Sequence, residues 1–523
     1  MPTFFRSARR AALAAATAAA ALGTVQGCTD LTETPRDALT PETAFRTDGE
    51  ITAGVAGVYA QLRQSQWANY NLSEISSDAQ LVPTRGNDWG DNGRWIEIYQ
   101  QTWTSASGSA LDDMNRQWND NFAGVARANL LISVVNASNS AIKPAALAEL
   151  RTLRAWYYYL LMDFFGGLPI VTEPGAAPTA RATRDSTFRF IESELRAALP
   201  DLPTKANVQY GRVNKDVANA ILANMYINAP VFQGTPTAAG ITRAAPRYAD
   251  AIAAADAVIN SGNYTLEPDF RINFALNNEV SRENIFVIVN SSTAGLGMSI
   301  PQRALHYNSF SIGAWNGFSA TADAYAAFNP ADPRRAQILT GPQRSFTTGN
   351  LINDRSGAPL VFTPTIGDIR RASEGEGGRV TKFPPSPRPN DGDSHPNDFP
   401  FFRLAEMVMI KAEALNEQGQ TAAAIALVNQ IRARAFGNTS NNLSTGLSQA
   451  ATRQAILNER LFEFIGEAKR RQDLIRMGGL AGVSNSYTGA RTFKTATDPY
   501  RVLFPIPSNQ IANNPLLTQN PGY

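Results

Sequence analysis

The sequence holds very little cysteine and histidine. Its 523 residues include one cysteine, Cys28, and two histidines, His306 and His395. A single cysteine excludes an intramolecular disulfide and a cysteine-ligated zinc site. The two histidines are far apart in the sequence, and neither has a metal-ligand partner at helical spacing. We therefore expect no metal site and no cofactor.

The short motifs of several enzyme classes are also absent. The chain contains no His-Glu-x-x-His zinc motif, no phosphate loop, no Gly-x-Gly-x-x-Gly turn and no Gly-x-Ser-x-Gly nucleophile elbow. Paired acids could still serve a glycosidase, and Asp112-Asp113 and Asp391/Asp393 are the obvious pairs to consider. Adjacent acids are more typical of solvated loops and helix starts, where the helix dipole stabilises them.

No excess of positive charge is available for nucleic-acid binding. The formal charge is +2, but residues 1–27 carry Arg6, Arg9 and Arg10 and no acid, so their removal takes the charge to −1. The body of the chain has no long run of lysine or arginine. Binding to nucleic acid is therefore not expected. An apolar fraction of 43% and a charged fraction of 18% are typical of a folded protein.

The first 27 residues have the three parts of a secretory signal. The basic start is followed by an alanine- and leucine-rich stretch from 11 to 25 and then by Gln26-Gly27. The apolar stretch is too short and too rich in alanine for a confident membrane-spanning helix. Val25-Gln26-Gly27-Cys28 looks like a bacterial lipobox, so we expect Cys28 to be acylated and to become the N-terminus. Plain secretion with a coincidental cysteine is the alternative.

Helical periodicity dominates the remaining chain. Thr40-Pro41 reads as a helix cap, and Thr47 and Glu50 have the spacing of a capping box. Further helices are expected over the following ranges: 111–135, 145–165 (stopped at Gly166-Gly167-Leu168-Pro169), 213–226, 248–259, 404–418 and 421–435. The last two resemble a tetratricopeptide unit broken at Gly419. The clearest strand is 284–289, and long irregular loops are expected at 84–109, 295–317 and 341–398.

Aromatic residues gather in two of these regions. The first group is Trp67, Tyr70, Trp89, Trp95, Tyr99 and Trp103, interleaved with polar side chains, and the second is Tyr307, Trp315 and Asn316. A sugar ring has apolar C–H faces and a hydroxyl rim, so an aromatic platform with nearby Asp, Asn and Arg suits it. Burying about 80–100 Å² of apolar area on one ring contributes roughly 2–2.5 kcal/mol. The alternative is that most of these rings belong to the core.

The C-terminal part carries the most specific motifs. Residues 458–464 (NERLFEF) lead into residues 466–476 (GEAKRRQDLIR), and the chain finishes with FPIP at 504–507 and QNPGY at 519–523. Residues 402–414, residues 153–169 and the lipobox agree with the same pattern. These motifs resemble the SusD/RagB family of nutrient-binding outer-membrane lipoproteins. The charged residues of the motif are read as scaffold ion pairs, namely Glu459, Arg460, Glu463, Glu467, Arg470 and Asp473.

The resemblance implies a mainly α, tetratricopeptide-like scaffold of helix pairs with long irregular loops and minor β-structure. It implies an N-terminal half at 28–235 and a C-terminal half at 236–523, packed as one globular unit. It also implies a non-catalytic, lipid-anchored outer-membrane protein that faces the cell exterior and associates with a SusC-type TonB-dependent transporter. The ligand would be a glycan or another nutrient. By rough position, the candidate ligand-binding residues are Asp78, Arg85, Trp89, Trp103 and Trp315.

Two other functions fit parts of the pattern. The helix pairs are also typical of a helical-repeat scaffold that binds only proteins. The acids and aromatic residues are also compatible with a surface glycoside hydrolase. The first alternative predicts no small-ligand binding, and the second predicts turnover that depends on an Asp or Glu.

Overall fold

The computed structural model describes residues 45, 47–106, 108–310, 313–387 and 394–523. The expected signal sequence, Cys28, Thr40-Pro41, Asp391 and Asp393 lie outside these residues. Residues 46–523 cluster as one compact unit. The expected boundary near residue 235 stays a prediction.

The first long helices begin and end where local sequence signals place them. Helix α2 (Asp48–Ile75) starts at a complete capping box, in which Thr47 accepts from the Glu50 N–H and Glu50 accepts from the Thr47 N–H. Helices α4 (Leu111–Ala137) and α5 (Lys143–Phe165) follow. Gly166 ends α5 because its φ of 79° is a conformation that glycine adopts without strain.

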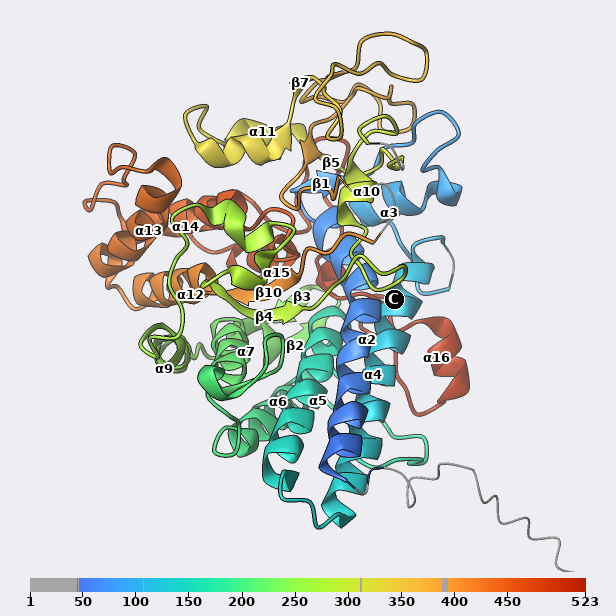
Figure 1. Ribbon diagram of the computed structural model, residues 1–523, viewed down its shortest axis with the longest axis vertical. Helices are drawn as coiled ribbons and strands as arrows, with labels where there is room; N and C mark the ends of the chain where they lie inside the picture. The colour runs from blue at the N-terminus through green and yellow to red at the C-terminus, as the bar shows by residue number, and fades with distance from the viewer. Residues whose placement is uncertain (1–44, 46, 107, 311–312, 388–393) are drawn as a thin grey trace, which may run out of the picture. The chain divides into compact units, whose positions relative to one another are not determined.

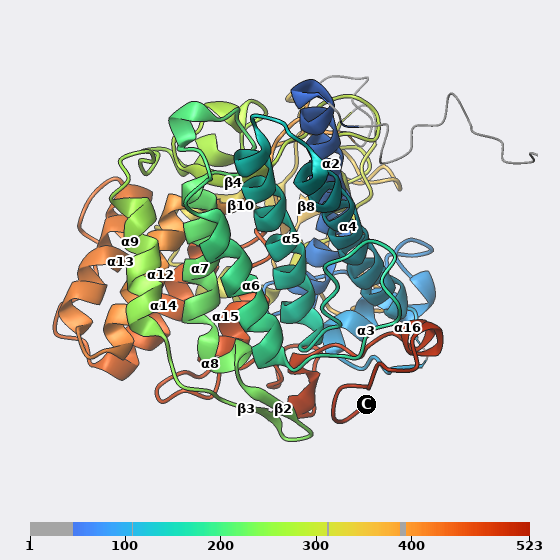
Figure 2. The same ribbon diagram turned by 90° about the horizontal axis from the view of Figure 1, so that it is seen from below.

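Each long helix packs against its neighbour in the chain. Figure 2 shows this row of helices running from α4 through α5, α6 and α7 to α9, α12 and α13. The expected pairs α7/α9 and α12/α13 are both present, so the mainly α architecture of helix pairs is confirmed. In the described part of the chain no helix is long and apolar enough to cross a bilayer. The bounds are α6 (Arg184–Ala198), α7 (Lys215–Ile227), α9 (Tyr248–Ile259), α12 (Leu404–Glu417), α13 (Thr421–Phe436) and α14 (Gln449–Phe464).

An aromatic core joins the early helices to the later part of the chain. The C-terminal half of α5 is almost entirely buried, and Trp156 contacts both strands of a short antiparallel pair. The strands are β4 (Asn284–Ile288), close to the predicted strand, and β10 (Phe399–Arg403). The Trp156 ring lies 4.6 Å from Phe401 and 5.3 Å from Phe286, measured between centroids. This packing places β10 where it leads directly into α12.

The regions expected to be irregular loops contain short elements. The first includes α3 (Arg94–Gln100), the second α10 (Ile300–Ala304), and the third only short strands. Figure 1 shows α3, α10 and α11 gathered at one end of the long helices. The remaining elements are β1 (Gln80–Leu81), η1 (Asp91–Gly93), η2 (Lys205–Asn207), α8 (Ala229–Phe232), β2 (Thr235–Thr237), β3 (Gly240–Thr242), η3 (Phe270–Phe274), η4 (Asn278–Val280), β5 (Ser319–Ala320), α11 (Ala322–Ala327), η5 (Pro333–Gln337), β6 (Ile338–Leu339), β7 (Gly341–Pro342), β8 (Val361–Phe362), β9 (Arg379–Val380), α15 (Arg470–Met477), η6 (Pro499–Val502) and α16 (Ser508–Asn513).

A buried ion network binds the C-terminal elements together. Arg403, at the end of β10, contacts Glu283 at 2.7 Å, Glu463 at 2.7 Å and Glu467 at 2.8 Å. Glu463 also pairs with Arg334 at 2.9 Å and Arg434 at 2.5 Å. Burial raises the pKa of Glu463, but the surrounding arginines more than offset this and hold it well below its ordinary value. The carboxylate therefore stays ionised inside the protein.

The charged residues of the C-terminal motif form ion pairs, as the sequence predicts. Asp473 pairs with Arg460 at 2.8 Å and with Arg476 at 2.7 Å. Arg470 reaches across to Asp78 at 2.6 Å. Asp473, Arg460, Arg476 and Arg470 are buried, and their pairs tie α14 to α15 and α15 to Asp78.

We predict that Arg403→Met destabilises the protein by about 3–5 kcal/mol, because it leaves three buried carboxylates short of one cation. The control Arg189→Met removes the surface pair with Asp185, whose arginine side chain is 72% exposed. Arg189→Met should lower the free energy of unfolding by no more than about 0.5 kcal/mol. Urea unfolding of both variants measures the difference, and equal free energies of unfolding would contradict the role of the network.

Candidate functional site

Three half-buried tryptophans from distant parts of the sequence lie together. Trp67 belongs to α2, Trp89 follows β1, and Trp315 follows α10. The centroid of the Trp315 ring is 6.4 Å from that of Trp67 and 6.5 Å from that of Trp89. The ring planes are inclined by 55° and 47°, so the three rings form a curved surface. We call Trp67, Trp89 and Trp315 the aromatic arc.

Buried rings hold the arc from behind. Trp89 contacts Trp95 at 5.4 Å and Phe318 at 5.8 Å between centroids, and both of these rings are buried. The Trp89 indole N–H donates a hydrogen bond to the Trp315 carbonyl. Gly317 is needed for this packing, because a Cβ there would lie 2.3 Å from the Trp89 ring. Trp89 is therefore fixed by its neighbours on several sides.

The Trp67 ring packs against a buried cation. The guanidinium carbon of Arg303, on α10, lies 3.7 Å from the centroid of the ring. Arg303 also donates to the Asn71 side chain at 2.8 Å, which connects α10 to α2. A guanidinium over an indole face is an attractive arrangement, and here it orients the ring at one end of the arc.

Beside the arc, polar groups are linked through Arg355. Its side chain donates to Asp88 at 3.0 Å and to Glu374 at 2.5 Å, and its guanidinium lies over the Tyr307 ring at 3.9 Å. Tyr307 donates its hydroxyl to Asp88, and His306 contacts Glu374 at 2.9 Å. Burial raises the pKa of Glu374, but hydrogen bonds from Arg355 and His306 outweigh it and lower the pKa. The rim is therefore charged and rich in hydrogen-bonding groups.

Two buried arginines support the loop that carries Trp315. Arg379 donates to the Asn316 side-chain oxygen at 2.7 Å, and Arg85 donates to Ser319 at 3.0 Å. In the described part of the chain, neither forms an ion pair, and each also donates hydrogen bonds to backbone carbonyls, among them those of Glu374 and Glu376. Burial lowers the pKa of Arg85 to about 10, so it remains protonated at neutral pH. Asn316 has a φ of 53°, a strained backbone that these contacts stabilise.

The structure brings together only part of the candidate set. Trp89 and Trp315 are neighbours in the arc. Arg85 is 1% exposed beneath it, so it positions the loop and does not face solvent. Trp103 is fully buried, donates to the Tyr523 hydroxyl at 2.7 Å and packs on Phe504. Asp78 is bonded by Arg470. The contacts of Arg85, Trp103 and Asp78 are therefore structural ones, and none of the three belongs to the group of Trp89 and Trp315.

Trp67, Tyr307, Arg355 and Glu374 were not among the candidates. Trp67 and Tyr307 belong to the two aromatic groups of the sequence, but nothing local separates them from rings in the core. Arg355 and Glu374 lie in a long region with no periodic pattern, and only the fold places them near Asp88. Of the acid pair considered for hydrolysis, Asp113 is buried and paired with Arg94 at 2.6 Å.

The arrangement offers a curved apolar surface with a polar rim. Sugar rings can stack on tryptophan through their C–H faces, while hydroxyl groups reach the carboxylates and guanidinium beside them. The rings are held by packing before a ligand arrives, which lowers the entropic cost of binding.

Comparison with known families gives two matches along the chain. The family described as SusD matches residues 282–523. The family described as "Starch-binding associating with outer membrane" matches residues 33–227. The two matched regions do not overlap and lie on either side of residues 228–281.

Individual relatives cover most of the chain. SusD-like protein P25 of Formosa agariphila is 26% identical over 94% of this chain and 96% of its own length. Starch-binding protein SusD of Bacteroides thetaiotaomicron is 24% identical over 72% of each chain. The solved structure of surface glycan-binding protein A from Bacteroides thetaiotaomicron, in complex with laminarihexaose, superposes with a TM-score of 0.68 at 19% identity. It covers 91% of this chain and all of its own, which shows a shared fold.

We predict that Trp103→Ala lowers the free energy of unfolding by about 3–5 kcal/mol, because it empties a buried aromatic site. Trp315→Ala should cost only about 1–2 kcal/mol, because Trp315 is only half-buried. Urea unfolding distinguishes the two variants. If Trp315→Ala destabilises as much as Trp103→Ala, the arc is part of the core and not a surface for ligands.

Proposed function

The chain belongs to the SusD/RagB family, and from that premise we propose that it is a non-catalytic surface protein that captures glycans on the aromatic arc. It would deliver the bound oligosaccharide to a SusC-like TonB-dependent transporter of the outer membrane. Two relatives carry starch binding or glycan binding in their names, and this supports a glycan as the ligand class.

The observation that carries the proposal is the arc itself. Trp67, Trp89 and Trp315 are only half-buried, although Trp89 packs on buried Phe318 and Trp67 packs on buried Arg303. A chain that needed these rings only for its core would gain by burying them fully. Their exposure beside Asp88 and Arg355 is the arrangement expected for a sugar-binding platform.

Weak binding is expected. Two or three ring contacts at roughly 2–2.5 kcal/mol each are opposed by the cost of association, which leaves affinities of about 10⁻³ to 10⁻⁵ M. Such an affinity would suffice for delivery, because a ligand held between the protein and a transporter experiences a high effective concentration.

The location follows from the N-terminal motif. Acylation of Cys28 would anchor the protein in the outer membrane, and Thr29 after the cysteine favours that membrane over the inner one. The family description that includes association with the outer membrane supports this placement. We propose that the protein faces the cell exterior, where it meets glycans before the transporter does.

Binding without turnover is favoured over hydrolysis. The two acids of the polar rim, Asp88 and Glu374, are both engaged by Arg355, and this favours roles in hydrogen bonding. If the protein were a hydrolase, it would release products from a polysaccharide, and substitution of one acid would abolish their release. A scaffold that binds only proteins would show no response of the tryptophans to oligosaccharides.

We predict that the soluble form beginning at Thr29 binds at least one neutral oligosaccharide, such as laminarihexaose or maltohexaose, without cleaving it. Trp89→Ala and Trp315→Ala should each weaken binding about 30- to 70-fold, because each removes one stacking surface worth roughly 2–2.5 kcal/mol. Calorimetry measures the affinity, and chromatography of the ligand after incubation measures turnover.

Tyr210→Ala is the matched control for these variants. Tyr210 is 43% exposed and lies outside the arc, so its removal should leave the affinity unchanged. Equal binding by the wild type and by both tryptophan variants would place the ligand elsewhere and contradict the proposed site.

We also predict a stable complex with the transporter. Coexpression of the full-length protein with its SusC-like partner, followed by purification through a tag on the transporter, should recover both chains in mild detergent. A Cys28→Ala variant tests the anchor separately, because it should leave the outer-membrane fraction when expressed alone. Recovery of the transporter without this protein would count against delivery.

A further inference from the structure

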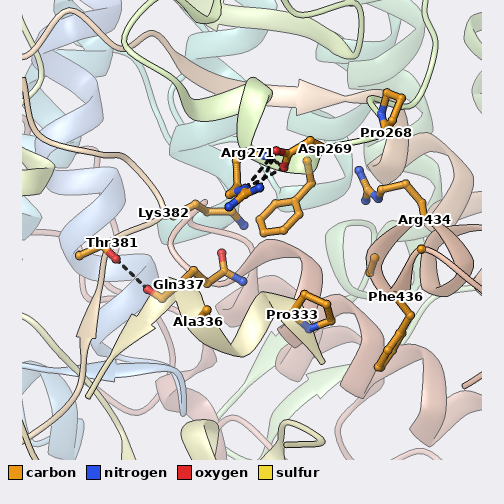
Figure 3. A pocket seen from close by; sticks show the side chains of 13 residues that line it. Pro268, Asp269, Arg271, Pro333, Ala336, Gln337, Thr381, Lys382, Arg434 and Phe436 are labelled. Atoms are coloured by element: carbon orange, nitrogen blue, oxygen red, sulfur yellow. Dashed lines mark hydrogen bonds and ion pairs between the residues drawn. The ribbon is translucent and has the colours of Figure 1, made fainter. Parts of the chain in front are cut away.

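A cavity lies in the C-terminal part of the fold. Figure 3 shows it between Asp269 and Arg271 on one side, Pro333 and Gln337 below, and Arg434 on the other side. Its volume is about 480 Å³, within the range of roughly 300–1,000 Å³ that small-ligand sites occupy. The lining comes from η3 and the residues before it, from η5, and from the end of α13. It shares no residue with the aromatic arc.

The walls provide apolar surfaces. Phe270 and Phe436 line the cavity and are both half-buried, so neither residue is fully enclosed by the protein. Pro268 and Pro333 add further apolar surface. At the mouth, Gly437 has a φ of 68°, and no atom lies within 4 Å of the position where its Cβ would be. The lining at Gly437 therefore borders open space.

The floor presents an acceptor that has no partner. Gln337 is 8% exposed, and in Figure 3 its amide points toward the middle of the pocket. Its amide N–H donates to the Phe462 carbonyl at 3.3 Å, but among the described residues no group donates to its side-chain oxygen. Buried acceptors are normally satisfied, so this oxygen indicates a position for a ligand hydroxyl.

The charges around the pocket are already compensated. Arg271 pairs with Asp269 at 2.7 Å, and Arg434 pairs with Glu463 at 2.5 Å. Lys382 is bound to Glu467 and to two backbone carbonyls. An ionic ligand would have to compete with these pairs, whereas a neutral ligand with several hydroxyl groups can bond to them without separating charge.

We propose that this pocket is a second saccharide site, which takes one neutral sugar unit against the apolar lining that includes Phe270 and Phe436. The inference rests on the proposed function for its ligand class, but not on the aromatic arc. A neutral oligosaccharide would place a ring face on the phenylalanines and direct a hydroxyl group to Gln337. The protein would then hold glycan at two separate places on one chain.

A unique thiol at the pocket tests this. The soluble form beginning at Thr29 has no cysteine, so Ala336→Cys places a single exposed reactive group on the lining. Laminarihexaose or maltohexaose should slow its alkylation by iodoacetamide about fivefold at about four times the dissociation constant, since the free fraction falls as 1/(1+[L]/Kd). Phe436→Ala should abolish the protection, whereas Tyr210→Ala should not, and thermal melting confirms that each variant is folded.

The two sites are separated by repeating the measurement with Trp89→Ala and Trp315→Ala combined. Tryptophan fluorescence, measured as oligosaccharide is added, reports binding at the arc. If this response disappears in the double variant while the thiol is still protected, an independent second site is supported. If oligosaccharide protects the thiol but does not change the tryptophan fluorescence of a chain with the arc intact, the arc is refuted as a binding site and the pocket is retained. An alkylation rate unchanged by neutral oligosaccharides up to about 10 mM, the weak end of useful affinity, overturns the inference. Protection by uronic-acid oligosaccharides alone overturns it as well.

Discussion

The ion network around Glu463 is the constraint on which the rest of the fold depends. One carboxylate from α14 is bonded by arginines from η5, β10 and α13 at once. A buried charge costs several kcal/mol to desolvate, so the network forms only if these elements reach their places together. Arg403 extends the same network to Glu283 next to β4, and Glu467 extends it toward Lys382. The C-terminal motif is therefore a folding requirement, and its charges need no catalytic explanation.

Buried charged side chains also hold the candidate site in place. Arg85 and Arg379 are buried without carboxylate partners in the described structure, and they bond to the backbone and to Asn316. They hold the loop before β5 in a strained conformation, which keeps Trp315 beside Trp89. The scaffold thus uses buried cations to fix aromatic rings at the surface. A rigid platform suits weak binding of an oligosaccharide better than a flexible loop would, because less conformational entropy is lost on binding.

Local signals in the sequence predict most of the helices. The capping box at Thr47 and Glu50, the apolar spacing of α4 and α5, and the break at Gly419 are each contained in a few neighbouring residues. The motif charges also predict ion pairs, although their partners come from other elements. Short helices such as α3 lie within regions rich in polar residues and glycine, where no periodic signal identifies them.

The site is harder to predict because long-range contacts decide which rings are exposed. Trp103 and Trp315 look equivalent in sequence, yet Trp103 is buried by Phe504 and by Tyr523, 420 residues away. Asp78 is likewise occupied by Arg470, 392 residues further along. Composition identifies the aromatic groups, and only tertiary structure separates Trp89 and Trp315 from their neighbours in the core.

The most direct test of the account is a crystal structure of the soluble chain soaked with the tightest-binding oligosaccharide. The account predicts continuous ligand density across Trp67, Trp89 and Trp315, with hydroxyl groups within hydrogen-bond distance of Asp88 or Arg355. Density for a bound oligosaccharide elsewhere, with the arc empty and its rings unmoved, would contradict the claim that the arc captures the ligand.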